Sequence, residues 1–240
     1  MIPLSDANPT RRMPILTYVL IAINIMVFLW EMTLGERALQ NAFLDLSVVP
    51  SKFSANPASL ESMLDLLRSM FFHGGFEHIA GNMLYLWLFG DNVEDRLGKI
   101  GYLFLYFASG AAAALAQIMI DPNSEIPLVG ASGAIAGVLG SYLILFPGIK
   151  VRGVMPLGRM ASMTEMPAWV VLGFWFVLQL VNGIGSLGAN AQYGGGVAFF
   201  AHIGGFVMGM ILTVLLMQIV PQPPAEVRKE IAYQRAGAIR

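Results

Sequence analysis

Long apolar runs separated by short polar stretches dominate this chain. A helix needs about 20 apolar residues to cross the hydrocarbon core of a membrane. Six runs come close to that length, and we expect each of them to form a membrane-spanning helix: 14–34, 78–97, 100–120, 129–147, 167–184 and 197–220. The second run is the least regular, because Asn82 and Asp91 interrupt it. The pattern therefore predicts an all-α polytopic membrane protein, built as a bundle of six helices.

The composition strengthens this expectation. The chain is 56% hydrophobic and only 12% charged, with a mean hydropathy of +0.67, whereas a soluble domain has about 25% charged residues. The net charge of −1 gives no indication of nucleic-acid binding. The absence of cysteine from the sequence excludes disulfides, thiol catalysis and cysteine-ligated metals.

The first apolar run resembles a signal peptide, because Arg11 and Arg12 precede it. The run is too long for the apolar part of such a peptide and lacks a small-x-small cleavage site. We therefore expect it to be a retained anchor. The expected organisation is then a cytoplasmic amino-terminal segment (1–13), one helical domain (14–220) and a polar cytoplasmic tail (221–240).

The basic residues indicate how the bundle is oriented. With the amino terminus inside, eleven of the 14 Lys and Arg residues fall on the inner side, and only Arg37, Lys52 and Arg68 lie outside. Such an excess in short inner loops is the positive-inside pattern. We expect a multi-pass protein of a prokaryotic cell membrane with both termini in the cytoplasm.

Two connections have patterns of their own. Within 35–77, apolar residues recur at helical spacing opposite charged ones, which predicts an amphipathic helix at the membrane interface or one packed on the rim of the bundle. The apolar positions are Leu60, Met63, Leu64, Leu67 and Phe71. The connection 183–196 is rich in glycine and uncharged. It could form a lid over a site, or be a simple connector.

Two polar side chains near the ends of apolar runs point to chemistry. Ser132 lies in Gly130-Ala131-Ser132-Gly133 at the start of the fourth run, and His202 lies near the start of the sixth. Polar groups inside hydrocarbon are costly, so they are functional candidates by default. A serine with a histidine as its base is the minimum requirement for acyl transfer. On the predicted topology, both residues lie towards the outer face.

Stripes of small residues predict that these two helices pack closely. The fourth run contains Gly133, Gly137 and Gly140, and the sixth contains Gly205 and Gly209. Small side chains allow helix backbones to approach one another within a membrane. Such contact would bring Ser132 and His202 together.

The second run offers hydrogen-bond donors to an oxyanion. His78 and Asn82 are four residues apart and share one helix face, and the Ser132 N–H at a helix start has no helical partner. These three donors could form an oxyanion hole. Alternatively, His78 and Asn82 hold neighbouring helices together. Since no carboxylate falls on the His202 face, we expect a Ser–His dyad rather than a triad.

Other protease types fit the sequence less well. The zinc-binding His-Glu-x-x-His motif is absent, because His73 and His78 have the wrong spacing. A site formed by all three histidines would be accidental, so we expect no metal and no cofactor. Asp91 has no intramembrane partner for aspartyl catalysis, and the surroundings of Ser132 differ from the G-x-S-x-G elbow of soluble hydrolases.

Three segments in this order resemble the rhomboid intramembrane serine proteases: residues 73–82 (HGGFEHIAGN), 130–133 (GASG) and 201–209 (AHIGGFVMG). The resemblance covers essentially the whole chain. It implies that Ser132 is the nucleophile and His202 the general base, with His78, Asn82 and the Ser132 N–H binding the oxyanion. The implied substrates are single-span transmembrane proteins within the lipid bilayer, cut near the outer face. The natural substrate and the oligomeric state are not indicated.

Some positions agree with the family pattern and others depart from it. Glu94-Asp95-Arg96 is similar to an acid-x-arginine motif with a structural role. No Trp-Arg pair occurs in the first outer connection, and Ala136 replaces an aromatic residue that stacks on the histidine in several members. What orients His202 is therefore open.

Two other functions are alternatives to a protease: a rhomboid-like client-binding protein and a transporter. The presence of both Ser132 and His202 disfavours the client-binding protein, and the scarcity of intramembrane charge disfavours the transporter.

Overall fold

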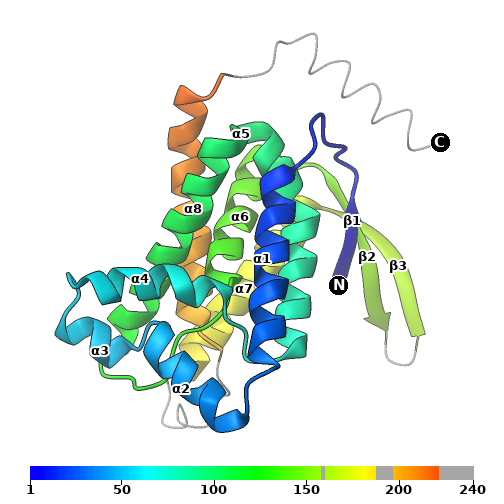
Figure 1. Cartoon of the computed structure of the whole chain (residues 1–240). Helices are drawn as coiled ribbons and strands as arrows, with labels where there is room; N and C mark the ends of the chain where they lie inside the picture. Colours follow the sequence, from blue (N-terminus) through cyan, green and yellow to red (C-terminus); the bar gives the residue numbers. More distant parts are fainter. Residues whose placement is uncertain (158–159, 188–196, 222–240) are drawn as a thin grey trace.

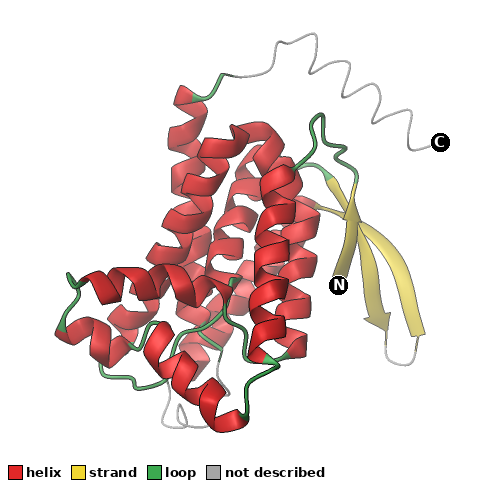
Figure 2. Ribbon diagram, viewed as in Figure 1, coloured by secondary structure: helices red, strands yellow, loops and turns green. Residues whose placement is uncertain are grey.

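The computed structural model describes residues 1–157, 160–187 and 197–221, and it is mostly helical (Figures 1 and 2). The helices are α1 (Ile15–Glu31), α2 (Glu36–Leu46), α3 (Pro50–Ala55), α4 (Leu60–Arg68), α5 (Phe76–Ile120), α6 (Ser132–Leu145), α7 (Ala168–Ser186) and α8 (Phe199–Ile219), with a 3₁₀ turn η1 (Ser69–Phe71) after α4. The strands are β1 (Ile2–Asp6), β2 (Lys150–Leu157) and β3 (Met160–Pro167).

Helix α5 combines the second and third apolar runs. Its backbone leaves the helical region at Gly98, with φ 74° and ψ 168°. Only glycine adopts this conformation without strain. The helix changes direction there, at the top of Figure 1, so that the two runs form the two arms of α5.

The apolar helices differ in length. Within the described part of the chain, α5, α7 and α8 are long and apolar enough to cross a membrane, whereas α1 and α6 are shorter apolar helices. Helix α6 has 14 residues, which gives a length of about 21 Å. It is shorter than the predicted run, because residues 129–131 are not helical and the helix ends ahead of Pro147. The count of six membrane spans stays a prediction.

Helix α6 forms the centre of the bundle, packed between α5 and α8. Every residue from Gly133 to Tyr142 is buried. A Cβ atom added to Gly205 would overlap the carbonyl oxygen of Gly133, and one added to Gly209 would overlap that of Gly137. The close backbone packing of these two helices, predicted from their small residues, is therefore confirmed.

The prediction of an all-α fold is wrong in one respect, because the chain also forms a three-stranded sheet in the order β1-β2-β3. Both strand pairs are antiparallel. The strands were missed because β1 and β2 are far apart in the sequence and neither alternates clearly between apolar and polar residues. Asp6 at the end of β1 accepts hydrogen bonds from Asn92 of α5 (3.2 Å) and from the hydroxyl of Tyr142 of α6. The sheet is thereby attached to the bundle.

The Glu94-Asp95 pair joins α5 to the beginning of α1. The Glu94 carboxylate accepts from the backbone N–H of Leu16 at 3.0 Å and from that of Thr17 at 2.8 Å. It therefore satisfies donors that the first turn of α1 leaves without helical partners. Asp95 forms an ion pair of 2.9 Å with Arg11. These contacts agree with the structural role expected for this motif.

The connection between α1 and α5 contains α2, α3 and α4. The amphipathic helix predicted there is confirmed as α4, which Ser59 caps by accepting from the Ser62 N–H at 3.1 Å. Leu60, Met63 and Leu67 are exposed, which agrees better with a helix at the membrane interface than with one packed against the rim of the bundle. Of the connection predicted over 183–196, residues 183–186 belong to α7, and 188–196 lie outside the described residues.

Candidate active site

Ser132 and His202 meet where α6 and α8 begin. The Ser132 Oγ lies 2.8 Å from the His202 Nε2, within hydrogen-bond distance, and both residues are half-buried. The backbone contact between Gly133 and Gly205 lies beside this pair. The two side chains therefore lie where the backbones of α6 and α8 are in direct contact.

The loop before α6 is held on both sides. The N–H of Gly130 donates to the carbonyl of Ser69 at 2.9 Å, and the N–H of Leu128 donates to that of Val48 at 2.7 Å. Gly130 has a φ of +129°, a value that favours glycine. A Cβ atom at this position would also lie 2.7 Å from the His78 Nε2. Glycine is thus required there both for the backbone turn and for the space.

His78 and Ser132 border the same small space. The point where a Gly130 Cβ would lie is 2.7 Å from the His78 Nε2 and 3.5 Å from the Ser132 Oγ. The His78 Nδ1 accepts from the Gly74 N–H at 3.3 Å, so in the neutral ring the Nε2 carries the proton. The Nε2–H is therefore available as a donor beside Ser132.

Asn82 lies one turn after His78 on the first arm of α5. It is buried, with 7% of its surface exposed, and its Nδ2 has no hydrogen-bond partner among the described residues. Buried amide donors are rarely left without a partner. An amide in this state is one that a ligand oxygen could satisfy.

His73 supports the start of α5. Its backbone N–H donates to the Glu31 carboxylate at 3.0 Å, and its ring packs 5.1 Å from that of His78. Burial, followed by the nearby His78, lowers the pKa of His73 to about 4, so this ring is neutral near pH 7. Within the described ranges, no three His, Cys, Asp or Glu side chains gather as a metal site would require.

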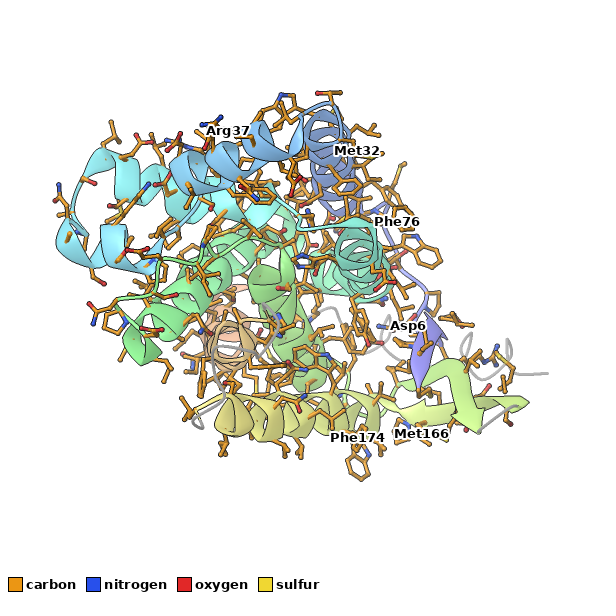
Figure 3. All side chains as sticks on the ribbon, turned by 90° about the horizontal axis from the view of Figure 1, so that it is seen from below. Asp6, Met32, Arg37, Phe76, Met166 and Phe174 are labelled. Atoms are coloured by element: carbon orange, nitrogen blue, oxygen red, sulfur yellow. The ribbon has the colours of Figure 1, made fainter. Side chains whose placement is uncertain are left out.

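Helix α7 supplies two neighbours of His202 that sequence reasoning missed. The Gln179 Oε1 lies 2.9 Å from the His202 Nδ1, and the Trp175 ring packs 5.9 Å from the imidazole at 36°. Neither neighbour is the carboxylate of a triad or an aromatic residue at position 136. An available signal was the lone polar Gln179 in the apolar stretch 168–181. Figure 3 shows α7 at the margin of the bundle, with Phe174 on its outer side.

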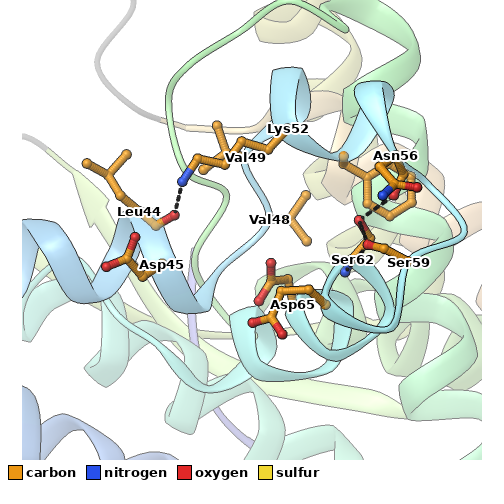
Figure 4. Close-up of a pocket in the computed structure, with 11 residues that line it drawn as sticks. Leu44, Asp45, Val48, Val49, Lys52, Asn56, Ser59, Ser62 and Asp65 are labelled. Carbon is orange, nitrogen blue, oxygen red and sulfur yellow. Dashed lines mark hydrogen bonds between the residues drawn. The ribbon is translucent and has the colours of Figure 1, made fainter.

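A separate hollow of about 320 Å³ lies among α2, α3 and α4 (Figure 4). Lys52 at its edge donates to the carbonyl of Leu44 at 2.7 Å. Asp65 also lines it; burial raises the pKa of this carboxyl, while the neighbouring Arg68 opposes the rise. None of the residues lining the hollow is Ser132, His202, His78 or Asn82, so it is distinct from the candidate active site.

The fold is that of a helical integral membrane protein with a serine–histidine pair between two of its helices. The family model described as "Rhomboid domain" matches residues 60–219, so the chain belongs to the rhomboid family. It is 31% identical to Rhomboid protein 1, mitochondrial, of Saccharomyces cerevisiae, over 82% of this chain and 51% of that protein.

Two bacterial relatives are named as proteases. The chain is 30% identical to Rhomboid protease GluP of Bacillus subtilis, over 73% of this chain and 32% of that protein. It is 27% identical to Rhomboid protease AarA of Providencia stuartii, over 83% of this chain and 71% of that protein. The chain spans about half or less of the length of the yeast protein and of GluP.

Proposed function

We propose that this chain is an intramembrane serine endopeptidase with Ser132 as its nucleophile and His202 as its general base. The observation that carries the proposal is the 2.8 Å hydrogen bond between the Ser132 Oγ and the His202 Nε2. An activated serine is recognised by a base within about 2.6–3.2 Å of its hydroxyl. Membership of a family with relatives named as proteases supports the same conclusion.

The reaction proceeds in two halves. The Ser132 Oγ attacks the carbonyl carbon of the scissile peptide bond while the His202 Nε2 takes the hydroxyl proton. The tetrahedral intermediate then collapses, the C–N bond breaks, and the imidazolium gives its proton to the departing amine. Water, deprotonated by His202, attacks the acyl ester on Ser132. The carboxylate product leaves and the serine hydroxyl is restored.

The oxyanion of each tetrahedral intermediate would be held by the His78 Nε2–H, the Asn82 amide and the backbone N–H of Ser132. Support comes from the space that His78 shares with Ser132 and from the unpartnered Asn82 Nδ2. Donors fixed in place before the reaction stabilise the developing charge without reorganising. They add to the positive end of the α6 dipole.

The substrates in this proposal are single-span proteins cut in the outer part of their membrane segment. A stable helix cannot offer its carbonyls to Ser132, because they are tied up in hydrogen bonds, so the substrate segment must unwind easily. We further propose six spans with both termini on the cytoplasmic side, following the distribution of Lys and Arg. The membrane would be that of a prokaryotic cell.

Fluorophosphonate labelling of the purified protein tests the catalytic proposal. Wild type should react at Ser132, as mapped by mass spectrometry, and should cleave a model single-span substrate. Ser132→Ala and His202→Ala should each abolish cleavage, and the double variant should be no worse than either, since the two residues act as a unit. A folded wild-type protein that neither reacts nor cleaves but retains membrane clients would instead be a client-binding protein.

The position of the cut in the substrate and the membrane topology of the protein test the proposed cleavage site and orientation. Because the sequence contains no cysteine, single cysteines introduced at residues 37 and 229 can be labelled with membrane-impermeant maleimide in intact cells. Residue 37 should react from outside and residue 229 only after lysis. A substrate cut at its cytoplasmic end would contradict both the orientation and the assignment of the site.

A further inference from the structure

The imidazole of His202 has a hydrogen-bond partner on each of its two nitrogens. The Nε2 lies 2.8 Å from the Ser132 Oγ, and the Nδ1 lies 2.9 Å from the Gln179 Oε1. The three side chains come from α6, α8 and α7 and form a continuous line through the ring. The carboxylate that serves this purpose in a triad is replaced by the oxygen of a neutral amide.

The Gln179 contact selects one tautomer of the ring. A neutral imidazole carries a single N–H, and the nitrogen that bears it is set by the bond that the other nitrogen makes. The amide oxygen can only accept, so the Nδ1 facing it must carry the proton. The Nε2 then presents its lone pair to the Ser132 hydroxyl, as a base requires. The opposite tautomer would place two acceptors face to face at Gln179 and an N–H towards the serine.

We propose that Gln179 is a positioning residue for the reaction, which fixes the tautomer and the rotation of the His202 ring. This inference rests on the proposed function of the Ser132–His202 pair. After the Nε2 has taken the serine proton, the imidazolium still donates its Nδ1–H to the same amide oxygen. The bond therefore persists through the proton transfer, and Gln179 itself exchanges no proton.

The surroundings of Gln179 agree with this role. It is half-buried and is the one polar side chain between residues 168 and 181 of an otherwise apolar helix, a position where a polar group is costly unless it has a partner. Trp175 lies four residues earlier, on the same face of α7, and its ring packs on the imidazole. Together the two side chains support His202, whereas the fully buried Ala136 has no ring with which to do so.

The test compares Gln179→Leu, which removes the acceptor at similar volume, with Asn182→Leu as the matched control. Asn182 is an exposed amide on the same helix. Gln179→Leu should lower both kcat and the rate of fluorophosphonate labelling by about 10–100-fold, the value of one lost buried hydrogen bond, with KM unchanged. Asn182→Leu should match wild type. Gln179→Glu should recover much of the rate at alkaline pH, where the carboxylate is ionised and accepts.

Nitrogen-15 NMR of the histidines reports on the tautomer directly. The chain has three histidines, and His202→Asn identifies the signals of His202. In wild type, the Nδ1 of His202 should give a protonated signal and its Nε2 an unprotonated one; in Gln179→Leu this preference should be lost. An unchanged tautomer, or unchanged kcat and labelling in Gln179→Leu, would overturn the proposal. If wild type neither cleaves nor labels, the proposed function itself fails; if wild type is active and the tautomer does not depend on Gln179, only the positioning role fails.

Discussion

The contact of α6 with α8 and the contact of α7 with α8 are two different kinds of interface. Helix α6 is buried along ten of its 14 residues, and its glycine backbone touches that of α8 directly. Helix α7 buries only Ala168, Leu172 and Gly183 among its 19 residues and meets α8 through side chains. Ser132 and His202, the proposed reacting pair, belong to the first interface, and Gln179 and Trp175, which contact the histidine, come from the second.

This difference separates two requirements of the site. The distance from the Ser132 Oγ to the His202 Nε2 depends on two backbones that are already in direct contact and cannot come closer. The tautomer and rotation of the His202 ring depend on Gln179 and Trp175, which sit on a helix whose outer face is apolar and exposed. A shift of α7 relative to α8 would therefore alter the surroundings of the His202 ring without separating it from Ser132. Substitutions on each side can test this division.

The largest effect is expected where the backbones touch. Gly209→Ala places a Cβ within the backbone of Gly137, so α6 and α8 must separate. We expect a loss of about 3 kcal/mol of stability and the loss of most cleavage. Gly173→Ala in α7 is the control, because nothing lies within 4 Å of its added Cβ; it should be neutral or stabilise by up to about 1 kcal/mol.

Thermal unfolding in detergent, together with the yield of monodisperse protein, measures both glycine variants. Equal midpoints for Gly209→Ala and Gly173→Ala would mean that the α6–α8 contact is not as rigid as its geometry indicates.

The sequence was informative where a local pattern determines a contact. The glycines of α6 and α8 predicted close packing, and the polar residues beside them predicted the pairing of Ser132 and His202. The role of Gln179 could not be predicted in this way, because the rotation of α7 about its axis is set by packing with α8 and not by its own apolar pattern. The sheet was missed for a similar reason, because β1 and its partner β2 are separated in the sequence by the helices α1 to α6.

The second prediction concerns Asn82, which lies on α5, outside the two contacts compared above. Asn82→Ala removes a buried amide donor that has no partner among the described residues. If this amide binds the oxyanion, kcat should fall by about 10–1000-fold, which is typical for the loss of one such donor. Stability should change little, because no protein acceptor is left unpaired. Asn182→Ala, at an exposed amide of α7, is the matched control.

Measurement of kcat and KM on a model substrate distinguishes the two interpretations of Asn82. A fall in stability with unchanged kcat would assign Asn82 to holding helices together and not to the reaction.

The smallest effect is expected at Trp175, on the side of α7. Its ring packs against His202 and, at 5.8 Å, against Phe206. Aromatic pairs contribute about 0.5–1.5 kcal/mol beyond the area they bury, so Trp175→Ala should slow cleavage by about 2–10-fold, and Trp175→Phe should keep most of the rate. Trp169→Ala provides the control, since Trp169 is exposed on the same helix.

Combined with Gln179→Leu, Trp175→Ala should cost less than the product of the two separate effects, because both side chains act on one ring. Fully multiplicative losses in kcat would show that the two residues of α7 act independently of each other, and would contradict a joint support of the His202 ring.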